Sequence, residues 1–425
     1  MKTKHIVITT NLYRQATKSR SDFDHPSGNN NLYQNLDPRL ATSIALQELP
    51  AGWQLSWHII ITQPSPVSKN SLNKIKEHIK TAGQKAEIKI FAFENIQGIH
   101  EINPKLFNLT TYPGTRNTAF ALANLDRADI LIQIDADEEL PPNYLSTVIQ
   151  TLEQNPRISA LGGFYLEEGR RVSPLADPLE SWPKYSAMNV DTTEITANDK
   201  VAPSYFAKGG NLIVTRKFYK KMCFPTAIPR GEDFAMILRA WLTYYNGNKK
   251  AGIKAKDPIF KFWVNPSRDM AIIHHTHHAA IKNFLNYLEK NLERFAIETN
   301  TIKNQKGLSP RQLRSDSTYI GKVIFIPNFP TIVQTIYAEL HKKARKGTSM
   351  ITNPVVVSLR AATAGPENGP TYTKAQIENS KIRLMAHWEK IKERNYWRQF
   401  QKEQAEYIEA LKSVSRLGRP KPLAN

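Results

Sequence analysis

Short runs of aliphatic and β-branched residues alternate with longer amphipathic stretches along the first 280 residues of the chain. The apolar runs predict strands, because such side chains favour a buried, extended backbone. The amphipathic stretches predict helices, because their apolar positions recur at helical spacing. Strands are predicted at residues 5–10, 53–62, 87–93 and 128–135, and helices at residues 36–49, 71–83, 115–125 and 141–155. Strands that alternate with helices are typical of a mainly parallel sheet, so the sequence predicts an α/β fold.

The pattern changes in the second half of the chain. Residues 168–204 are rich in Pro, Asp, Asn and Ser, and this composition predicts a long loop that covers a site. Residues 281–299 are amphipathic, and residues 374–414 predict one long helix or two broken ones. Residues 344–372 have the composition of a linker. We therefore expect a catalytic domain over residues 1–300, a helical extension over 301–350, and a linker with a basic helical tail over 351–425.

Composition and charge narrow the class of protein. The chain has 425 residues, 40% of them hydrophobic, which is enough for a core and excludes a wholly disordered chain. Its net charge is +20, and after residue 300 there are 22 basic residues against 9 acidic ones. Such an excess favours a polyanionic partner, namely nucleic acid, an anionic membrane surface or a phosphorylated substrate. A general solubilising charge is the alternative.

The single cysteine, Cys223, excludes a disulfide framework and a multi-cysteine zinc site. The apolar run near the N-terminus is too short for a secretory signal. No stretch approaches the roughly 18 apolar residues of a membrane span. We therefore expect a soluble, cytosolic protein without a transmembrane segment, in a reducing compartment.

Two carboxylates, Asp135 and Asp137, come at the end of the fourth predicted strand. The carboxyl ends of parallel strands open onto the ligand crevice of such a sheet. Alternation along a strand predicts that both side chains lie on the same side. Hard divalent cations commonly bind through one or two carboxylates plus substrate phosphates. The pair therefore predicts a metal site, with a solvated turn at the strand end as the alternative.

Two motifs flank this pair along the chain. Upstream, Arg116 and Asn117 lie near the start of a predicted helix, where Arg and free backbone N–H groups suit a diphosphate. Downstream, Gly209 and Gly210 permit a close backbone approach before another predicted strand. Both motifs are compatible with a phosphorylated ligand.

Two further motifs carry acid–base or metal-binding side chains. Glu232 and Asp233 begin a predicted helix, where they are either catalytic or only a favourable interaction with the helix dipole. An apolar strand over residues 269–273 is followed by four histidines within residues 274–278, which are either ligands or a solvated turn. Each motif alone is weak, but their order along the chain is specific.

This order resembles the GT-A fold glycosyltransferases, in particular the family 2 group and its relatives. The resemblance covers residues 5–280 and is carried by RN at 116–117, DAD at 135–137, GGN at 209–211 with Arg216, GED at 231–233 with RAW at 239–241, and the histidine after the last strand. It implies a Rossmann-like, mainly parallel catalytic domain that binds a nucleotide-sugar donor, with a UDP-sugar as the expectation, and Mn²⁺ or Mg²⁺. The QxxRW motif and membrane helices of processive synthases are missing from the sequence, which argues against a processive polysaccharide synthase.

The resemblance also implies roles for individual residues. Asp137 is the expected direct metal ligand, Asp135 faces the ribose or the water shell of the metal, and His274 supplies a further ligand, with His275 and His277 as substitutes. The residues expected to bind the nucleotide sugar are Thr9, Thr10, Asn11, Arg14, Arg116, Asn117, Asp135, Gly209, Gly210 and Asn211. Asp233 is the expected general base, with Glu232 second. Retaining members carry Asn in place of this Asp, so the motif favours inversion.

The basic tail raises the question of the acceptor. Gly418, Arg419 and Pro420, with Arg416 and Lys421 beside them, are similar to the core of an AT-hook, although Leu417 replaces its usual basic residue. Aromatic residues interleave with Lys and Arg on the preceding helix, a combination that suits nucleic-acid contact. These aromatic residues are Trp388, Tyr396, Trp397, Phe400 and Tyr407. The alternative is a helix docked on the catalytic domain with a solvated basic face.

Three hypotheses for function follow. The first is a transferase that glycosylates hydroxylated or hydroxymethylated bases of DNA, as some phage enzymes do, in which case the protein works in the host cytoplasm. The second is a transferase that acts on a cell-surface glycan, a protein or a small molecule. The third is a nucleic-acid-binding protein on a degenerate transferase scaffold, against which the intact motifs argue.

Overall fold

The computed structural model describes most of the chain. The described residues are 3–13, 36–62, 66–167, 170–171, 179, 181, 186–206, 209–275, 284–307, 328–345 and 372–423. Arg14, His277 and nearly all of the predicted linker lie outside these residues.

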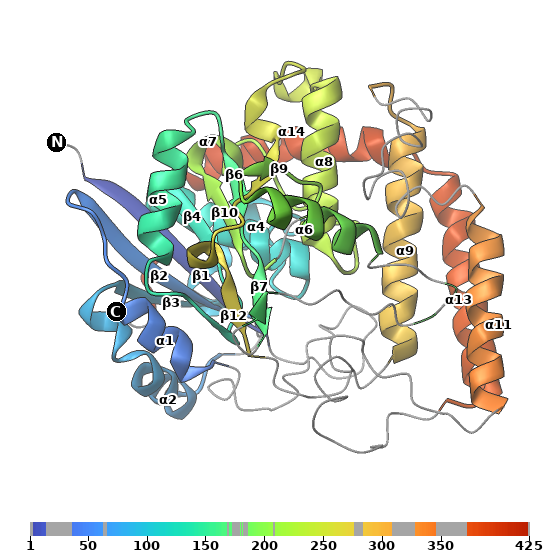
Figure 1. Ribbon diagram of the computed structural model, residues 1–425, viewed down its shortest axis with the longest axis horizontal. Helices are drawn as coiled ribbons and strands as arrows, with labels where there is room; N and C mark the ends of the chain where they lie inside the picture. The colour runs from blue at the N-terminus through green and yellow to red at the C-terminus, as the bar shows by residue number, and fades with distance from the viewer. Residues whose placement is uncertain are drawn as a thin grey trace.

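A central sheet of eight strands organises the fold (Figure 1). In spatial order its strands are β3 (Glu87–Ala92), β2 (Trp53–Ile61), β1 (Lys4–Leu12), β4 (Ile130–Gln133), β10 (Leu212–Thr215), β6 (Ala160–Gly162), β11 (Phe262–Val264) and β9 (Ala202–Pro203). The strands from β3 to β4 are parallel, whereas β10 runs antiparallel to both β4 and β6, and β9 runs antiparallel to β11. The predicted α/β fold with a mainly parallel sheet is confirmed.

Helices cover both faces of this sheet. One face is covered by α1 (Pro38–Ala45), α2 (Lys69–Ile79) and α5 (Tyr144–Gln154), and the other by α3 (Phe93–Ile102), α4 (Tyr112–Leu125), α7 (Arg216–Tyr219) and α8 (Glu232–Asn246). Short 3₁₀ helices lie between them at η2 (Ala82–Gln84), η3 (Lys249–Ala251), η4 (Pro258–Phe260) and η5 (Arg268–Met270). Alternation along β1 sends Ile6 and Ile8 to the first core and Val7 to the second.

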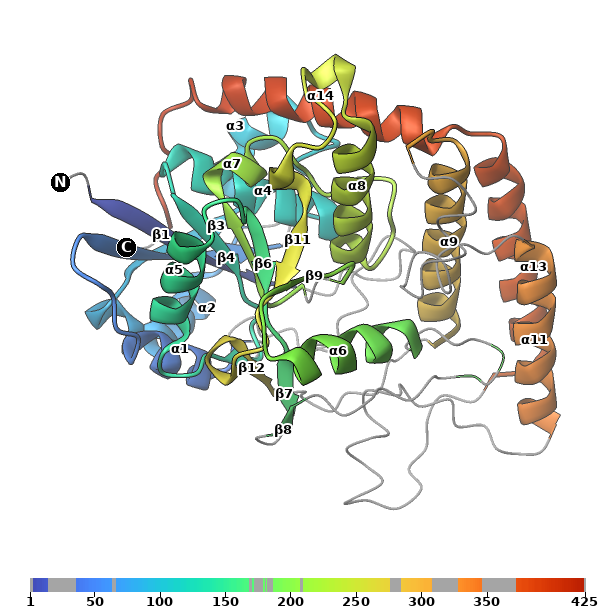
Figure 2. The same ribbon diagram turned by 45° about the horizontal axis from the view of Figure 1, so that its top comes forward.

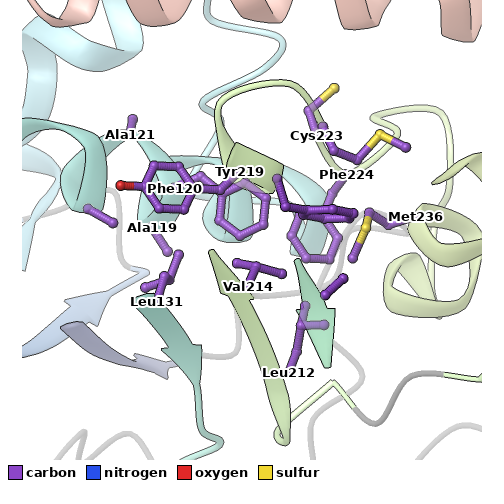
Figure 3. Packing of buried hydrophobic residues seen from close by; sticks show 14 of the residues in the cluster. Ala119, Phe120, Ala121, Leu131, Leu212, Val214, Tyr219, Cys223, Phe224 and Met236 are labelled. Carbon is purple, nitrogen blue, oxygen red and sulfur yellow. The ribbon is translucent and has the colours of Figure 1, made fainter. Parts of the chain in front are cut away.

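The core under α4 and α7 is rich in aromatic side chains (Figure 3). Phe120 of α4 packs against Tyr219 and Phe224 at ring-centroid distances of 6.0 and 5.2 Å. These rings lie over Leu131 of β4 and Val214 of β10. This packing holds α4 and the start of β4 in a fixed relation, which matters for the site.

A second, four-stranded sheet lies at one end of the first. Its order is β5 (Glu138–Glu139), β12 (Ile272–His274), β7 (Tyr165–Glu167) and β8 (Arg170–Arg171). The pairing of β5 with β12 is antiparallel and sets Glu138 opposite His274. The second sheet therefore brings the predicted acidic motif and the predicted histidine together.

Three details of the predicted elements are wrong. The fourth strand ends at Gln133 rather than at Asp135, because the chain turns there to form β5. Helix α5 begins at Tyr144, after the two prolines that we expected in its first turn. The segment 168–204, predicted as a loop, contains the helix α6 (Ser186–Asn198).

Four helices follow the two sheets, and we call them together the helical extension, a wider set than the one predicted over residues 301–350. They are α9 (Phe284–Lys303), α11 (Phe329–Arg345), α13 (Lys374–Lys392) and α14 (Tyr396–Val414). Helices α9 and α11 both pack against α13 (Figure 1). Residue 300, where we expected a domain boundary, lies within α9. Apolar residues of α8 and of the four extension helices share one buried cluster, so the extension forms a continuous core with α8.

Helix α14 lies across α3, α4 and α8 (Figure 2). Arg239 of α8 donates a hydrogen bond to Glu403 of α14 at 3.1 Å, and both side chains are buried. The hydroxyl of Tyr407 donates to the carbonyl of Tyr219 at 2.6 Å. These contacts attach α14 to α7 and α8.

The aromatic side chains of the tail are therefore not available to stack on bases. Tyr396, Trp397, Phe400 and Tyr407 are buried in the core, and Trp388 stacks on Phe329 at 4.7 Å. The sequence pattern could not separate a docked amphipathic helix from a nucleic-acid-binding one, and the structure shows the docked helix.

The segment similar to an AT-hook contacts the part of the chain that carries the central sheet. The guanidinium of Arg419 lies 3.5 Å from the carboxylate of Asp126, and the backbone N–H of Leu423 donates to the carbonyl of Ile90. Asn95 donates to the carbonyl of Lys421 at 2.8 Å.

Among the described helices, none is long and apolar enough to cross a membrane.

Candidate active site

The predicted site residues gather at the carboxyl ends of β1 and β4, where we expected a ligand crevice. They come from the starts of α4 and α8, the turn after β4, the segment before β10, and β12. Residues far apart in sequence therefore meet at one edge of the central sheet.

Arg116 connects most of these segments. Its Nε donates to Glu232 Oε1 at 2.6 Å, and its Nη1 donates to Gln133 Oε1 and to the Gly209 carbonyl, both at 2.8 Å. Its Nη2 lies 3.6 Å from Asp135 Oδ1. The buried guanidinium thus holds the two predicted acidic motifs and the glycine motif around one fixed positive charge.

The start of α8 places Asp233 beside Arg116. Gly231 precedes the helix with φ +68°, a left-handed conformation that favours glycine. A Cβ at Gly209 would lie 2.7 Å from Arg116 Nη2 and 3.1 Å from Asp233 Oδ2. The glycine therefore lets the Asp233 carboxylate and the guanidinium approach the same small space.

The environment makes Asp233 a suitable base. Loss of solvent raises the pKa of its carboxyl to about 6, and the negative charge of Glu232 adds to this rise, while Arg116 opposes it. A general base works best when its pKa lies near the operating pH. Glu232 is instead engaged by Arg116, so the geometry distinguishes two adjacent carboxylates by their partners.

Asp137 and His274 face each other across the turn after β4. The backbone N–H of His275 donates to the Asp137 carbonyl at 2.8 Å and aligns the two segments. His274 Nε2 then lies 3.6 Å from Asp137 Oδ2, and the imidazole stacks on Tyr165 with centroids 5.2 Å apart. The 3.6 Å between His274 Nε2 and Asp137 Oδ2 is too long for a good hydrogen bond.

The Asp137–His274 pair fits a divalent metal ion. Asp137 Oδ1 is buried and has no hydrogen-bond partner within the described part of the chain. Two donor atoms that each lie about 2.1 Å from one ion are roughly 3–4 Å apart, which matches the observed separation. The described residues contain no group of three or more His, Cys, Asp or Glu arranged around one point. A metal at this pair would therefore take its other ligands from water and substrate oxygens.

The predicted metal ligands do not all point to one place. Asp135 is turned toward Arg116, and His275 Nε2 lies 2.8 Å from Glu139 Oε2. Strand alternation does not govern Asp135 and Asp137 as we expected, because both lie beyond the end of β4, in a turn without strand geometry.

Glu138 is a site residue that the sequence analysis missed. Its buried carboxyl accepts from the Asp135 N–H at 2.7 Å, and a Cβ at Gly210 would overlap it. Burial raises the pKa of Glu138 well above its usual range, and the charges of Asp135 and Asp137 add to this rise. The run of four acids within 135–139 was the available signal, because such a run cannot all face solvent in a tight turn.

Several predicted ligand-binding residues support the framework instead. Asn117 pairs through both its amide atoms with the backbone of Phe224, at 2.8 and 3.0 Å. Asn211 accepts from Tyr144 at 2.7 Å and donates to the Met270 carbonyl at 2.8 Å. These buried side chains hold the loops on which the neighbouring site residues stand.

The residues predicted to bind the base and ribose lie at the end of β1. Thr10 accepts from Trp57 at 3.0 Å, and the Thr9 hydroxyl faces the Ile132 carbonyl at 3.4 Å. Asn11 donates to the hydroxyl of Tyr13 at 3.3 Å, and its buried carbonyl oxygen has no hydrogen-bond partner among the described residues. Asn11 thus carries a buried acceptor that no described group satisfies.

No protein-family model and no curated protein matches the chain. The chain is similar in structure to the mannosyltransferase PcManGT from Pyrobaculum calidifontis, solved in complex with GDP-Man and Mn²⁺, with 12% identity over 96% of this chain and 86% of that one, and a TM-score of 0.45. It is also similar to the apo form of mouse xyloside xylosyltransferase 1, with 9% identity over 66% of this chain and 99% of that one, and a TM-score of 0.31. Both are glycosyltransferases, the class that the motifs resemble, but at these TM-scores neither similarity carries an argument about function.

Proposed function

We propose that the protein is a GT-A-type glycosyltransferase that moves a sugar from a nucleotide-sugar donor to a hydroxyl acceptor with the help of a divalent metal. The observation that carries this proposal is the pair Asp137 and His274, whose Oδ2 and Nε2 atoms lie 3.6 Å apart, the spacing of two ligands of one ion. Arg116 and Asp233 lie at the same edge of the sheet. The transfer needs a metal site, a positive charge near the diphosphate and a general base, and Asp137 with His274, Arg116 and Asp233 are our candidates for these three roles.

Asp137 and His274 are the residues that would hold the metal. When bound, a metal ion such as Mn²⁺ or Mg²⁺ stabilises the charge of the leaving diphosphate as a Lewis acid. Arg116 contributes a fixed positive charge nearby, and its Nη2 is the atom nearest to Asp135. Asn11, at the end of β1, is our candidate contact to the base or ribose.

Asp233 would take the proton from the acceptor hydroxyl. In an inverting transfer the base acts on the hydroxyl while that oxygen attacks the sugar carbon from the side opposite the diphosphate. Only one free carboxylate is needed for this reaction. Asp233 supplies it, because Glu232 is paired with Arg116, and this arrangement supports inversion.

The acceptor is the least constrained part of the proposal. The docking of α14 removes the aromatic tail as support for a DNA acceptor, so that hypothesis depends on the net charge of +20 and on exposed cations such as Arg416. A glycan, protein or small-molecule acceptor requires no special tail, and it is our first proposal. Hydroxymethylated DNA is the second.

A donor screen tests the proposed function directly. Purified protein is incubated with a set of UDP- and GDP-sugars and Mn²⁺, and released nucleotide is measured with and without EDTA. We expect metal-dependent release with at least one donor, and its absence with all donors, or full activity in EDTA, would contradict the proposal. The screen is repeated with Asp137→Asn, which should lose the metal-dependent release. Its control is Glu153→Gln, the same carboxylate-to-amide change at an exposed ion pair.

An acceptor panel then separates the two acceptor proposals. It contains oligosaccharides, glycosylatable proteins, small alcohols and duplex DNA with hydroxymethylated bases. A DNA-acting enzyme should also bind duplex with a log–log salt slope of about −0.9 per phosphate contact. Transfer to DNA with such a slope would favour the second proposal over the first.

A further inference from the structure

A buried arginine of the helical extension packs against the first turn of the helix that carries the candidate base. Arg294 of α9 is 2% exposed, and its Nη1 lies 3.5 Å from the carbonyl oxygen of Gly231. Its guanidinium carbon lies 5.3 Å from the ring centroid of Phe234. The guanidinium therefore lies against the first turn of α8, between the residues that flank Glu232 and Asp233.

The glycine at the start of α8 is required by this contact as well as by its backbone. A Cβ at Gly231 would collide with the guanidinium of Arg294. The positive φ of +68° at the same position independently disfavours a side chain. Gly231 thus allows Arg294 to approach the segment that carries Asp233.

A second buried ionisable group stands one helical turn further along α9. Glu298 is 1% exposed, its Oε1 lies 3.9 Å from Arg294 Nε, and neither carboxyl oxygen has a hydrogen-bond partner within the described residues. Burying a carboxylate without hydrogen bonds is costly, so Glu298 is a poor choice for a purely structural position. Its nearest charge is Arg294, and its field also reaches Asp233.

We propose that Arg294 is a positioning residue for the Asp233 carboxylate and that Glu298 balances the charge of Arg294, so that the helical extension completes the active site. This inference rests on the proposed function. It gives the extension a role in the active site beyond packing, because Arg116 comes from the part of the chain that carries the sheet, whereas the second cation near the start of α8 comes from α9.

The charges around Asp233 predict how each change acts. The groups that face it are Glu232 on its own helix, Arg116 of α4, Tyr165 of β7, and Arg294 and Glu298 of α9. The positive charge of Arg294 favours the ionised Asp233 carboxylate. Burial raises the pKa of Glu298 to about 7, so Glu298 carries a negative charge that competes for Arg294 only above that pH. Removing the arginine should therefore raise the Asp233 midpoint near pH 6, whereas removing the glutamate should leave that midpoint nearly unchanged.

The test compares Arg294→Gln, Arg294→Lys and Glu298→Gln in the full chain. The control is Glu289→Gln, the same change on α9 at a buried carboxylate that pairs with Arg383 at 2.6 Å instead. The readouts are the pH profile of kcat, the melting temperature, and the ¹³C chemical shift of the labelled Asp233 carboxyl, assigned with Asp233→Asn.

We expect Arg294→Gln to raise the midpoint of the acidic limb by about one pH unit, and kcat at pH 6 to fall several-fold. Arg294→Lys should restore most of the profile, and Glu298→Gln and Glu289→Gln should leave the midpoint nearly unchanged, because the raised pKa of Glu298 keeps it largely protonated near pH 6. A melting temperature that falls while the Arg294→Gln midpoint stays at the wild-type value would overturn the proposal. If Arg294→Gln does not fold, Arg294→Lys decides, because its midpoint should still rise slightly, and an unmoved midpoint in that variant overturns the proposal.

The carboxyl chemical shift separates this inference from the proposed function. If no donor is turned over, the proposed function fails, but the Asp233 midpoint in the three variants still reports whether Arg294 and Glu298 act on that carboxylate. If donors are turned over and the midpoint does not move, the transferase proposal stands and the positioning role fails.

Discussion

Arg116 on α4 donates a hydrogen bond to Glu232 on α8 at 2.6 Å, with both side chains buried. This pair joins two helices whose first turns are separated by more than 100 residues of sequence. It also gives two adjacent acids different partners, because the Glu232 carboxylate accepts from the guanidinium and the Asp233 carboxylate accepts from the backbone N–H of Phe234 at 2.9 Å.

The first prediction follows from this difference in partners. Asp233→Asn should lower kcat by about 10²–10⁴-fold with little change in donor KM, because a proton acceptor acts on the chemical step. Glu232→Gln should instead raise the donor KM, because it loosens Arg116. The measurement is steady-state kinetics of both variants. A Glu232 variant that loses kcat while the Asp233 variant retains it would reverse the assignment.

If Asp233 is the base, it should also set the pH dependence of wild-type turnover. Its carboxyl must be ionised to accept a proton, and its pKa is raised to about 6, so kcat should rise with pH through about 6 and level off above 7. In Asp233→Asn this limb should disappear.

The second prediction concerns the metal. Asp137→Asn should abolish turnover and Mn²⁺ binding while the melting temperature stays near that of the wild type, because an amide is a poor ligand for a hard cation. Binding is measured by the Mn²⁺ EPR signal, which does not depend on turnover. His274→Ala should weaken Mn²⁺ binding, whereas His275→Ala, which removes a contact to Glu139, should leave it nearly unchanged. Equal losses for the two histidines would contradict the assignment.

The third prediction tests the close approach at Gly209. Gly209→Ala should lower activity by at least tenfold, because its Cβ would lie 2.7 Å from Arg116 Nη2 and force the guanidinium to shift. Gly83→Ala is the matched control, since a Cβ there meets only Ile88, at an ordinary 3.7 Å. The kinetics and melting temperature of both variants are compared. Normal turnover in Gly209→Ala would show that activity does not depend on the observed position of the Arg116 guanidinium.

The fourth prediction concerns the tail. Glu403→Ala should destabilise the protein by about 3–5 kcal/mol, because it leaves Arg239 buried without its partner. Glu406→Ala, on the exposed side of the same helix, should cost less than about 1 kcal/mol, since its ion pair with Lys402 is solvated. Urea unfolding of both variants measures the difference. Similar stabilities would mean that α14 is not fastened through Glu403.

The fifth prediction is a pH dependence of stability. Burial raises the pKa of Glu298 from 4.5 to about 7. Between these values the unfolded chain releases the proton while the folded chain retains it, so this group lowers stability as pH rises from about 4.5 to 7. In Glu298→Gln this loss should vanish. The stability of the variant relative to the wild type should therefore increase by about 2–3 kcal/mol between pH 4.5 and 8.

Denaturant unfolding at several pH values measures this change, with Glu289→Gln as the control. The Glu289 variant should follow the wild-type pH dependence, because its carboxylate is paired with Arg383. A constant difference between Glu298→Gln and the wild type would mean that Glu298 is already ionised at low pH.

The sequence by itself determined the order of strands and helices and the identity of most site motifs. Runs such as HIVITT are both apolar and β-branched, so their local preference and their burial agree, and β1 forms where it was predicted. Asp137 lies at the site because it follows β4, whose carboxyl end opens at that edge of the sheet. The alternation of strands and helices already indicates this position. The sequence did not indicate the second sheet, whose pairing of β5 with β12 brings His274 to the same place.

Only the tertiary structure decided how the charged groups are paired. Asp135 and Asp137 are two residues apart, yet the turn after β4 sends one toward Arg116 and the other toward His274. The reach of Arg294 to the start of α8, and the burial of the tail aromatics, depend on how α9 and α14 pack. Hydrophobic periodicity reports which face of a helix is buried but not against what, because the burial of apolar area is non-directional. The partners of a buried charge are therefore set by the packing of the whole chain.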